Sequence, residues 1–374
     1  MKWLFWGAAV LVFYTYAGYP LWLWLRARRF VVPVLRSNCT PSISVVMVVR
    51  NEDGVLRKKL LNLTLLNYPA DKLEVVVFSD GSTDGTQVIL SEFAAAEPRL
   101  RWMANPEPRG KAAGLNDAIS AARGEIVIFS DARQQIETDA VRVLVENFAD
   151  PAVGCVSGEL MLGDPAQGES EKGMGMYWRV EKKIREMESA SGSVIGATGA
   201  FYAARHELLE PIPEAILLDD VYIPLTILRQ HKRVLFDARA RAWDVADLGS
   251  SREFARKVRT LSGNYQLVQL APWSLTAENP ERFQFVSHKL LRLVSPFALA
   301  AVLVSSFFLP QPIYRAALLA QLVLYGLSLM AISSLALGPL TRIADAALTF
   351  VVLNTAALVA FANFVTGRKV AWTR

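Results

Sequence analysis

Short apolar runs rich in β-branched residues alternate with stretches of helical spacing in the first third of the chain. The runs are nearly continuous, which is typical of strands covered on both faces; they are ISVVMVV at 43–49, LEVVVFSD at 73–80 and GEIVIFSDA at 124–132. Helices are predicted between them at 50–69, 87–96 and 111–122, with a short strand near 100–103. This alternation predicts a parallel sheet with helices on both faces.

Four longer apolar segments follow a different pattern. Each has about 20 residues and few charges, the length that one helix needs to cross a bilayer; they are Trp3–Leu25, Leu290–Leu309, Ala316–Leu337 and Ala346–Val365. The composition agrees, because 52% of the 374 residues are hydrophobic and the mean hydropathy is +0.27. The first segment lacks a small-residue cleavage site and precedes RARR, so we expect an uncleaved anchor.

The predicted organisation is an anchor at 1–28, one domain at 40–250, an amphipathic interfacial region at 251–285, and membrane helices, about three, at 286–374. Basic residues flank the first span and open the second, so we expect an integral protein of the inner or plasma membrane with its domain in the cytosol. Counting spans then places both termini outside, whereas the basic tail GRKVAWTR favours the inside. A re-entrant C-terminal segment would resolve this conflict.

Charge and cysteine content exclude several classes of function. The net charge of +5 is explained by the basic groups beside the spans, so it is no sign of nucleic-acid binding. The two cysteines and three histidines are too scattered for a zinc site or a disulfide framework. No G-x-G-x-x-G follows the first strand and no Walker motif occurs, which argues against dehydrogenases and P-loop enzymes.

Polar residues gather where the predicted strands end. Asp80, Asp84 and Asp131 stand at or just after the ends of two strands, and Asn51 and Glu52 follow a third. Ligands of such sheets bind at the carboxyl ends of the strands. A single DGSTDG turn would be explained by turn chemistry alone. Three strand ends together with the basic RGKAAGLN segment predict a binding site.

The ordered motifs SVVMVVRNE, SDGSTDGT, RGKAAGLN, FSDA, GATGAFYAAR and LLDDVYIP resemble the inverting family 2 glycosyltransferases with a GT-A fold. The likeness extends over Ser42 to Arg259, and the membrane flanks are similar to those of the hyaluronan and cellulose synthase relatives. The resemblance implies an α/β GT-A fold, Rossmann-like and mostly parallel, joined to transmembrane helices. It also implies a nucleoside-diphosphate sugar as donor, with UDP expected before GDP.

By resemblance, Asn51, Glu52 and Asp80 hold the nucleoside, because carboxylates accept hydrogen bonds from ribose hydroxyls and base N–H groups. Lys111 approaches the diphosphate, where a cation stabilises the charge that develops on the leaving oxygens.

Asp131 stands where the family has the first Asp of its D-x-D metal motif, which implies Mg²⁺ or Mn²⁺ as cofactor. The chain departs from the pattern at Arg133, which replaces the second Asp. Two alternatives follow: Asp131 holds the metal with phosphates and water, or Arg133 takes over part of the charge neutralisation. We expect metal dependence.

The family's E-D motif aligns its last Asp with Asp220, which is the predicted catalytic base, and Asp219 is its supporting neighbour. Direct displacement at the anomeric carbon requires a carboxylate near the acceptor hydroxyl. A like charge close by raises the pKa of one of the two. The alternative is that the pair caps the following helix.

The acceptor side is predicted from three segments. GATGAFYAARHELL at 196–209 resembles the family's acceptor-side segment, in which small residues such as Thr198 and Gly199 would let a sugar approach the backbone, with Arg205 near the site; the alternative is a tight strand entry. Trp178 opens a helix and would either stack on a sugar face or pack in the core. A Gly-rich charged stretch at 163–175 is typical of a mobile loop.

The interfacial region carries a partial match to the Q-x-x-R-W motif of processive synthases. Arg256-x-x-Arg259-Thr260 keeps the Arg but lacks the Gln and the Trp, which puts processivity in doubt.

The resemblance implies an inverting hexosyltransferase that adds sugars to a growing polysaccharide at the cytosolic membrane face; in one version of this prediction it also secretes the polymer. The alternatives are single addition to a lipid-linked saccharide acceptor, and a membrane subunit that binds a nucleotide sugar without turnover. The expected partners are the nucleotide sugar, the acceptor, the bilayer and, because four spans are few for a channel, further copies of the chain.

Overall fold

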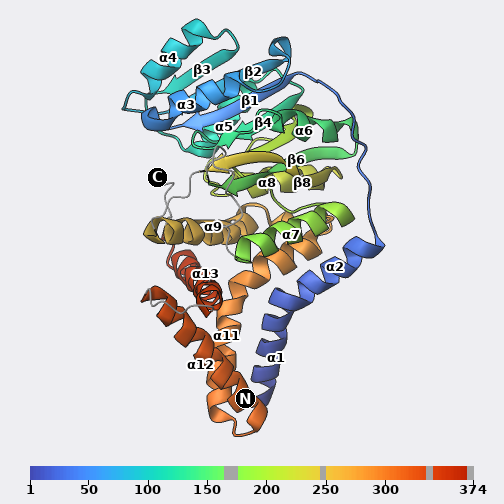
Figure 1. The fold of residues 1–374 in the computed structure, drawn as a ribbon, viewed down its shortest axis with the longest axis vertical. Coiled ribbons are helices and arrows are strands. Elements are labelled where there is room, and N and C mark those ends of the chain that lie inside the picture. Colours follow the sequence, from blue (N-terminus) through green and yellow to red (C-terminus); the bar gives the residue numbers. More distant parts are fainter. Residues whose placement is uncertain (164–175, 245–249, 334–339, 369–374) are drawn as a thin grey trace.

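The computed structural model describes residues 1–163, 176–244, 250–333 and 340–368. A mixed sheet forms the upper part of the molecule and apolar helices form the lower part (Figure 1). The strands are β1 (Ile43–Val49), β2 (Leu73–Asp80), β3 (Leu100–Asn105), β4 (Ile126–Ser130), β5 (Gln135–Ile136), β6 (Val153–Leu162), β7 (Phe201–Arg205) and β8 (Arg233–Asp244). Their order across the sheet is β3-β2-β1-β4-β7-β6-β8-β5.

The predicted parallel arrangement is confirmed for one half of the sheet. β1 pairs in parallel with β2 and β4, and β2 pairs in parallel with β3. The other half is mixed, because β7 runs antiparallel to both β4 and β6, and β5 runs antiparallel to β8. β7 begins with Phe201 opposite Ser130, the last residue of β4. The chain just before β7 therefore lies at the carboxyl edge of β4, beside Asp131.

Helices cover both faces of the sheet, as predicted. α3 (Asp53–Thr64), α4 (Thr86–Ala96) and α6 (Ala140–Glu146) pack on one face, and α5 (Lys111–Ala121) and α8 (Asp219–Arg229) pack on the other. Successive side chains of β1 belong to the two different cores, Val45 to the first and Val46 to the second. A strand that is covered in this way needs apolar residues at every position, which explains its continuous apolar run.

Four helices are long and apolar enough to cross a membrane, as predicted. The first, Lys2–Arg29, consists of α1 (Lys2–Phe13), a π-helical turn at 14–18 and α2 (Tyr19–Arg29). The second, Arg282–Phe308, consists of α10 (Arg282–Gln284), a π-helical segment at 285–290 and α11 (Leu291–Phe308). The others are α12 (Pro312–Ile332) and α13 (Thr341–Val365); the predicted end of the third span, at 337, lies outside the described residues.

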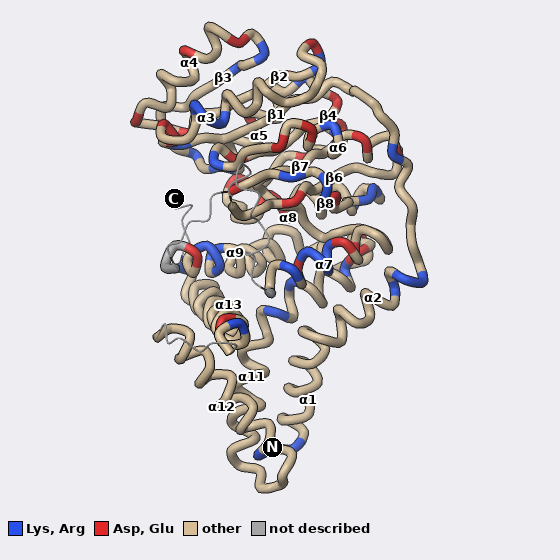
Figure 2. The backbone as a smooth tube through the Cα atoms, viewed as in Figure 1, with Lys and Arg blue, Asp and Glu red and all other residues tan. Residues whose placement is uncertain are grey.

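Two amphipathic helices, α7 (Met176–Ser191) and α9 (Ser250–Leu270), lie between the sheet domain and the spans (Figure 1). Charged residues are dense in the domain and on these two helices, whereas the spans are almost free of them (Figure 2). Residues 164–175 of the predicted mobile loop and 369–374 of the basic tail lie outside the described residues.

Candidate active site

The carboxyl edge of the parallel strands brings together acids that are far apart in the sequence. Asp131 follows β4, while Asp219 and Asp220 open α8. Lys111, the first residue of α5, lies between them: its Nζ is 3.1 Å from Asp131 Oδ1 and 3.4 Å from Asp219 Oδ2. One cation thus joins the predicted donor-binding and catalytic segments.

The acids around Lys111 keep its ammonium group charged. Burial by itself lowers the pKa of Lys111, but Asp131, Asp219 and Asp220 together outweigh burial and raise this pKa above its usual value. The site therefore holds a permanent positive charge at physiological pH, of the kind that stabilises a departing diphosphate.

Asp220 has the electrostatic environment of a base. Burial, followed by the neighbouring negative charge of Asp219, raises the pKa of Asp220 from 3.8 to about 6, against the opposing effects of Lys111 and Arg259 among other cations. A Cβ atom built on Gly199 would lie 2.8 Å from Asp220 Oδ2. Gly199 thus leaves the space that the carboxylate occupies, so the structure brings these two predicted site residues together. The preceding Thr198 accepts a hydrogen bond on its hydroxyl from Arg185 of α7 at 2.7 Å.

Asp80 is completely buried and shapes the loop in front of Lys111. Its two carboxylate oxygens accept hydrogen bonds from the backbone N–H groups of Arg109 at 2.7 Å and Gly110 at 2.8 Å. Gly110 has a φ of +97°, a conformation that favours glycine. The sequence predicted a direct contact of Asp80 with the nucleoside. In the structure its hydrogen bonds go to the loop that presents Lys111.

Asn51 holds the SDGSTDG turn in place. Its side-chain oxygen accepts a hydrogen bond from the Thr83 N–H at 2.7 Å, and its own N–H donates to the Ser82 hydroxyl at 3.1 Å. The N–H of Glu52 donates to the Thr86 hydroxyl at 2.8 Å. The residues after β1 and the turn after β2 therefore form one hydrogen-bonded unit at the edge of the site.

Asp131, the predicted metal ligand, does not form a complete metal site with other side chains of the described residues. Asp131 offers a carboxylate whose side chain is 38% exposed, but the described residues contain no group of three His, Cys, Asp or Glu that could hold a metal. Arg133 is turned toward Asp244 at the end of β8, with Nη2 3.7 Å from Asp244 Oδ2. Its guanidinium therefore already has an acidic partner, which weakens the alternative that it replaces the cation.

Arg205 does not belong to the site, and its predicted acceptor-side role is wrong. It pairs with Ile126 at the opposite end of β4 from Asp131. Its guanidinium donates to the backbone carbonyls of Val153, Phe148 and Asp150. The resemblance of GATGAFYAARHELL to an acceptor-side segment placed Arg205 near the site, but Arg205 is the last residue of β7, whereas Gly199 precedes this strand.

The remaining predicted residues lie on the two amphipathic helices. Arg259 of α9 is close enough to Asp220 to lower the pKa of that carboxyl group. Arg256, one turn earlier, is exposed. Trp178 is half-buried on α7, with its ring edge-on to Tyr177 at a centroid distance of 6.5 Å.

Lys59 is a buried lysine that the sequence reasoning missed. It is 0% exposed on α3, and its Nζ donates to the Ser130 hydroxyl at 2.8 Å and to the Gln134 carbonyl at 2.7 Å. Burial lowers its pKa to about 7, although Asp131 acts in the opposite direction. The spacing from Leu56 to Leu63 placed position 59 on the buried face of α3, a signal that was available. Lys59 braces the segment that carries Asp131 from behind.

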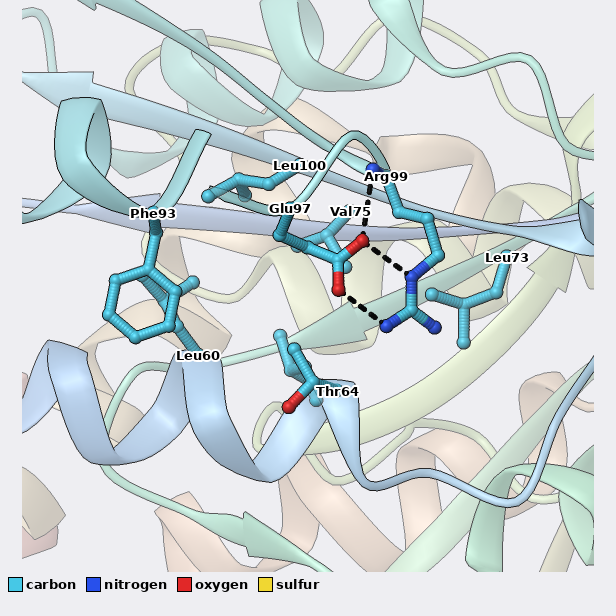
Figure 3. Close-up of a pocket in the computed structure, with 9 residues that line it drawn as sticks. Leu60, Thr64, Leu73, Val75, Phe93, Glu97, Arg99 and Leu100 are labelled. Carbon is cyan, nitrogen blue, oxygen red and sulfur yellow. Dashed lines mark hydrogen bonds and ion pairs between the residues drawn. The ribbon is translucent and has the colours of Figure 1, made fainter. Parts of the chain in front are cut away.

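A small cavity lies elsewhere, between α3, α4 and the edge of the sheet (Figure 3). It is lined by apolar side chains such as Leu60, Phe93 and Leu100, and the ion pair between Glu97 and Arg99 closes it. Its volume of about 10 Å³ is enough for one water molecule. It is therefore no candidate for the donor site.

The mixed sheet, the helices on both its faces and the acids at its carboxyl edge define a GT-A type of domain. Residues 44–212 match the family model Glycosyl transferase family 2, so the chain contains a domain of this glycosyltransferase family. A mannosyltransferase from Pyrobaculum calidifontis, solved with GDP-Man and Mn²⁺, has a TM-score of 0.73 at 25% identity. That match covers 98% of this chain and 100% of the other, spans included.

Curated relatives match the domain region. A beta-monoglucosyldiacylglycerol synthase of Synechocystis sp. is 26% identical over 167 residues, which are 44% of this chain and 35% of the relative. A poly-beta-1,6-N-acetyl-D-glucosamine synthase of Staphylococcus epidermidis is 23% identical over 236 residues, 62% of this chain and 57% of the relative. The chain thus spans between about a third and somewhat over half of the length of these relatives.

Proposed function

We propose that this chain is an inverting glycosyltransferase that transfers a sugar from a nucleoside-diphosphate donor to an acceptor hydroxyl at the cytosolic face of a membrane. The observation that carries the proposal is the position of Lys111 between Asp131 and Asp219, beside Asp220 with its raised pKa. Displacement of a diphosphate by a hydroxyl needs a cation at the leaving group and a carboxylate at the nucleophile. The cluster offers both.

In the proposed step, the acceptor oxygen attacks the anomeric carbon while the bond from this carbon to the diphosphate oxygen breaks on the opposite face. Asp220 takes the proton of the acceptor hydroxyl. With a pKa of about 6, Asp220 is ionised at neutral pH and is a stronger base than an ordinary carboxylate. Asp219, paired with Lys111, fixes the distance between the base and the leaving-group cation.

In this proposal the donor binds on the side of Lys111 that carries Asp80, Asn51 and Glu52. Asp80 presents Gly110 and Lys111 to the diphosphate, and Asn51 and Glu52 border the space for the nucleoside. Bound by Asp131 together with the donor's phosphates, Mg²⁺ or Mn²⁺ would supply Lewis-acid stabilisation of the leaving group. UDP-sugars are the expected donors, and the GDP-Man bound by the similar mannosyltransferase makes GDP-sugars the first alternative.

A growing polysaccharide is the first candidate acceptor, in keeping with the similarity to the polysaccharide synthase of S. epidermidis. A lipid-linked acceptor is the second, because only 11–39% of an 18-residue apolar stretch in each candidate span is buried. Most of the described span surface is thus available to lipid or to further copies of the chain. Spans with so few contacts to each other suit an enzyme whose acceptor stays in the membrane. Secretion of a polymer would need the spans of several copies of the chain.

The test is a donor screen on the full chain in nanodiscs, with UDP- and GDP-sugars, Mn²⁺ or Mg²⁺ and a membrane-lipid extract as the acceptor source. The expected result is release of nucleoside diphosphate with one donor, and its loss in Asp220→Asn. Product size on a gel, before and after lipid extraction, separates polymer from single addition. Binding of a nucleotide sugar without any turnover would instead support a non-catalytic membrane subunit.

A further inference from the structure

The segment that leads into the Asp219–Asp220 pair is bound by α9. The side-chain amide of Gln266 donates to the Ala215 carbonyl at 2.7 Å and accepts from the Leu217 N–H at 2.9 Å. These two bonds reproduce the pattern that a neighbouring strand would offer to an extended segment. Gln266 thereby fixes residues 215–217, directly before the first turn of α8.

A glycine brings the α9 backbone close to the same segment. A Cβ atom on Gly263 would lie 2.5 Å from Leu218 Cγ and 2.9 Å from its Cδ1. Leu218 is the N-cap residue of α8, immediately before Asp219. Leu267, on the next turn of α9, is completely buried in the same core as Leu218. One face of α9 is therefore fitted to the start of α8.

Another face of α9 rests on the last membrane span. The ring of Tyr265 stacks on Phe364 of α13, with centroids 4.9 Å apart and planes at 21°, and lies 6.2 Å from Phe361. Figure 1 shows α9 between the sheet domain and α13. Tyr265 and Gln266 are adjacent in the sequence. A movement of α9 relative to α13 would therefore also move the segment before Asp219, which Gln266 binds.

We propose that α9 positions the catalytic base, with Gln266 as the positioning residue that holds the start of α8 at a fixed place relative to the membrane spans. This inference rests on the proposed role of Asp220. Apolar packing by Leu267 would suffice to dock the helix. A glutamine that satisfies both a backbone donor and a backbone acceptor fixes the register as well, because a slip of one residue would break both bonds. The hydrogen bonds of Gln266 go to the backbone before Asp219, whereas Lys111 reaches this region only through its ion pair with Asp219.

Two variants test the two parts of the contact between α9 and α8, the hydrogen bonds and the packing. Gln266→Met keeps the size of the side chain and removes both hydrogen bonds, whereas Gly263→Ala keeps the bonds and forces Leu218 to move. Gln269→Met, at an exposed position of the same helix, is the matched control. All are measured as full-length protein in nanodiscs for kcat, donor KM, direct donor binding and melting temperature.

We expect both variants to lower kcat by roughly tenfold to a hundredfold, the usual result of displacing a reacting group by about an ångström. Donor KM and donor binding should stay within about threefold of the wild type, and the control should be unchanged.

A normal kcat in folded Gln266→Met would overturn the inference. So would a loss that follows a fall in melting temperature or weaker donor binding, since that is what a purely structural role predicts. If Asp220→Asn is inactive while Gln266→Met is normal, only the positioning role fails; an active Asp220→Asn refutes the proposed base itself.

Discussion

Replacing the carboxylate of Asp220 by an amide should separate catalysis from donor binding. Asn has nearly the same shape as Asp, so the fit against Gly199 is kept. Asp220→Asn removes the carboxylate that is proposed to take the acceptor proton, and general-base catalysis contributes about 10²–10⁴ in rate. We therefore expect Asp220→Asn to lose about that factor in kcat, with donor KM unchanged.

The pH dependence of the wild type follows from the same group. Because the pKa of Asp220 is about 6, its ionised fraction is about 9% at pH 5 and about 91% at pH 7. Transfer under kcat/KM conditions should therefore rise about tenfold between these values. Lys111 stays protonated throughout, since its pKa is raised.

Stability should change in the direction opposite to activity. In the unfolded chain the pKa of Asp220 returns to 3.8, so ionising it in the folded protein costs more than in water. This loss of folding stability is at its full value above pH 6. It decreases as the pH falls from 6 toward 3.8, and it is absent below pH 3.8. A shift of about two units corresponds to about 3 kcal/mol. Asp220→Asn removes this cost and should raise the melting temperature at pH 7, with little gain near pH 4.

The assay is nucleoside diphosphate release in nanodiscs at pH 5–8, together with thermal unfolding of the same samples. Glu214→Gln, at an exposed acid six residues earlier, is the control and should behave as the wild type. Turnover of Asp220→Asn within about threefold of the wild type would refute the reasoning, because a lost general base costs far more. A pH profile that is flat between 5 and 7 would contradict the raised pKa.

Three further predictions concern the donor side. EDTA should abolish transfer and Mn²⁺ or Mg²⁺ should restore it, while Asp131→Asn should require far more metal for half-maximal rate; undiminished turnover in EDTA would show that no cation is used. Asp80→Asn cannot accept both N–H bonds of the Arg109–Gly110 loop, so donor KM should rise severalfold with a smaller change in kcat, as measured by initial rates over a donor titration. The pKa of Lys59 is lowered to about 7, so between pH 7 and 10 Lys59 is neutral in the folded protein and charged in the unfolded chain. The wild type therefore gains stability as the pH rises through this range. Lys59→Met should remove this effect and make the melting temperature less dependent on pH.

The elements that the sequence predicts well are those with strong local patterns. The continuous run at β1 predicts a strand buried on both faces, and the four apolar segments predict the four candidate spans. The convergence of Lys111 with Asp131 also follows, because β3 and β4 belong to the parallel part of the sheet, whose strands bring their carboxyl ends to one edge.

The parts that the sequence could not predict depend on long-range geometry. The direction of β7 decides that Gly199 is in the site and Arg205 is not, and nothing in FYAAR specifies an antiparallel strand. The partner of Arg133 is Asp244, more than a hundred residues later, which no local pattern reveals. Asp80 looked like a ligand-binding acid because it ends a strand, whereas its contacts are backbone N–H groups of a loop that only the fold brings near.

The direction of acceptor entry follows from how the base is surrounded. Asp220 has the donor-side cation Lys111 on one side and Arg259 of the amphipathic helix α9 on another, and α9 itself rests on the span α13. β1, β2 and the helices α3 and α4 lie at the end of the molecule opposite the membrane helices (Figure 1). If the donor binds at Lys111 as proposed, we expect the acceptor to reach Asp220 from the side of α7, α9 and the spans. A hydroxyl group carried on a membrane-held chain, whether polymer or lipid, meets this requirement, because its attachment keeps it at the level of these helices.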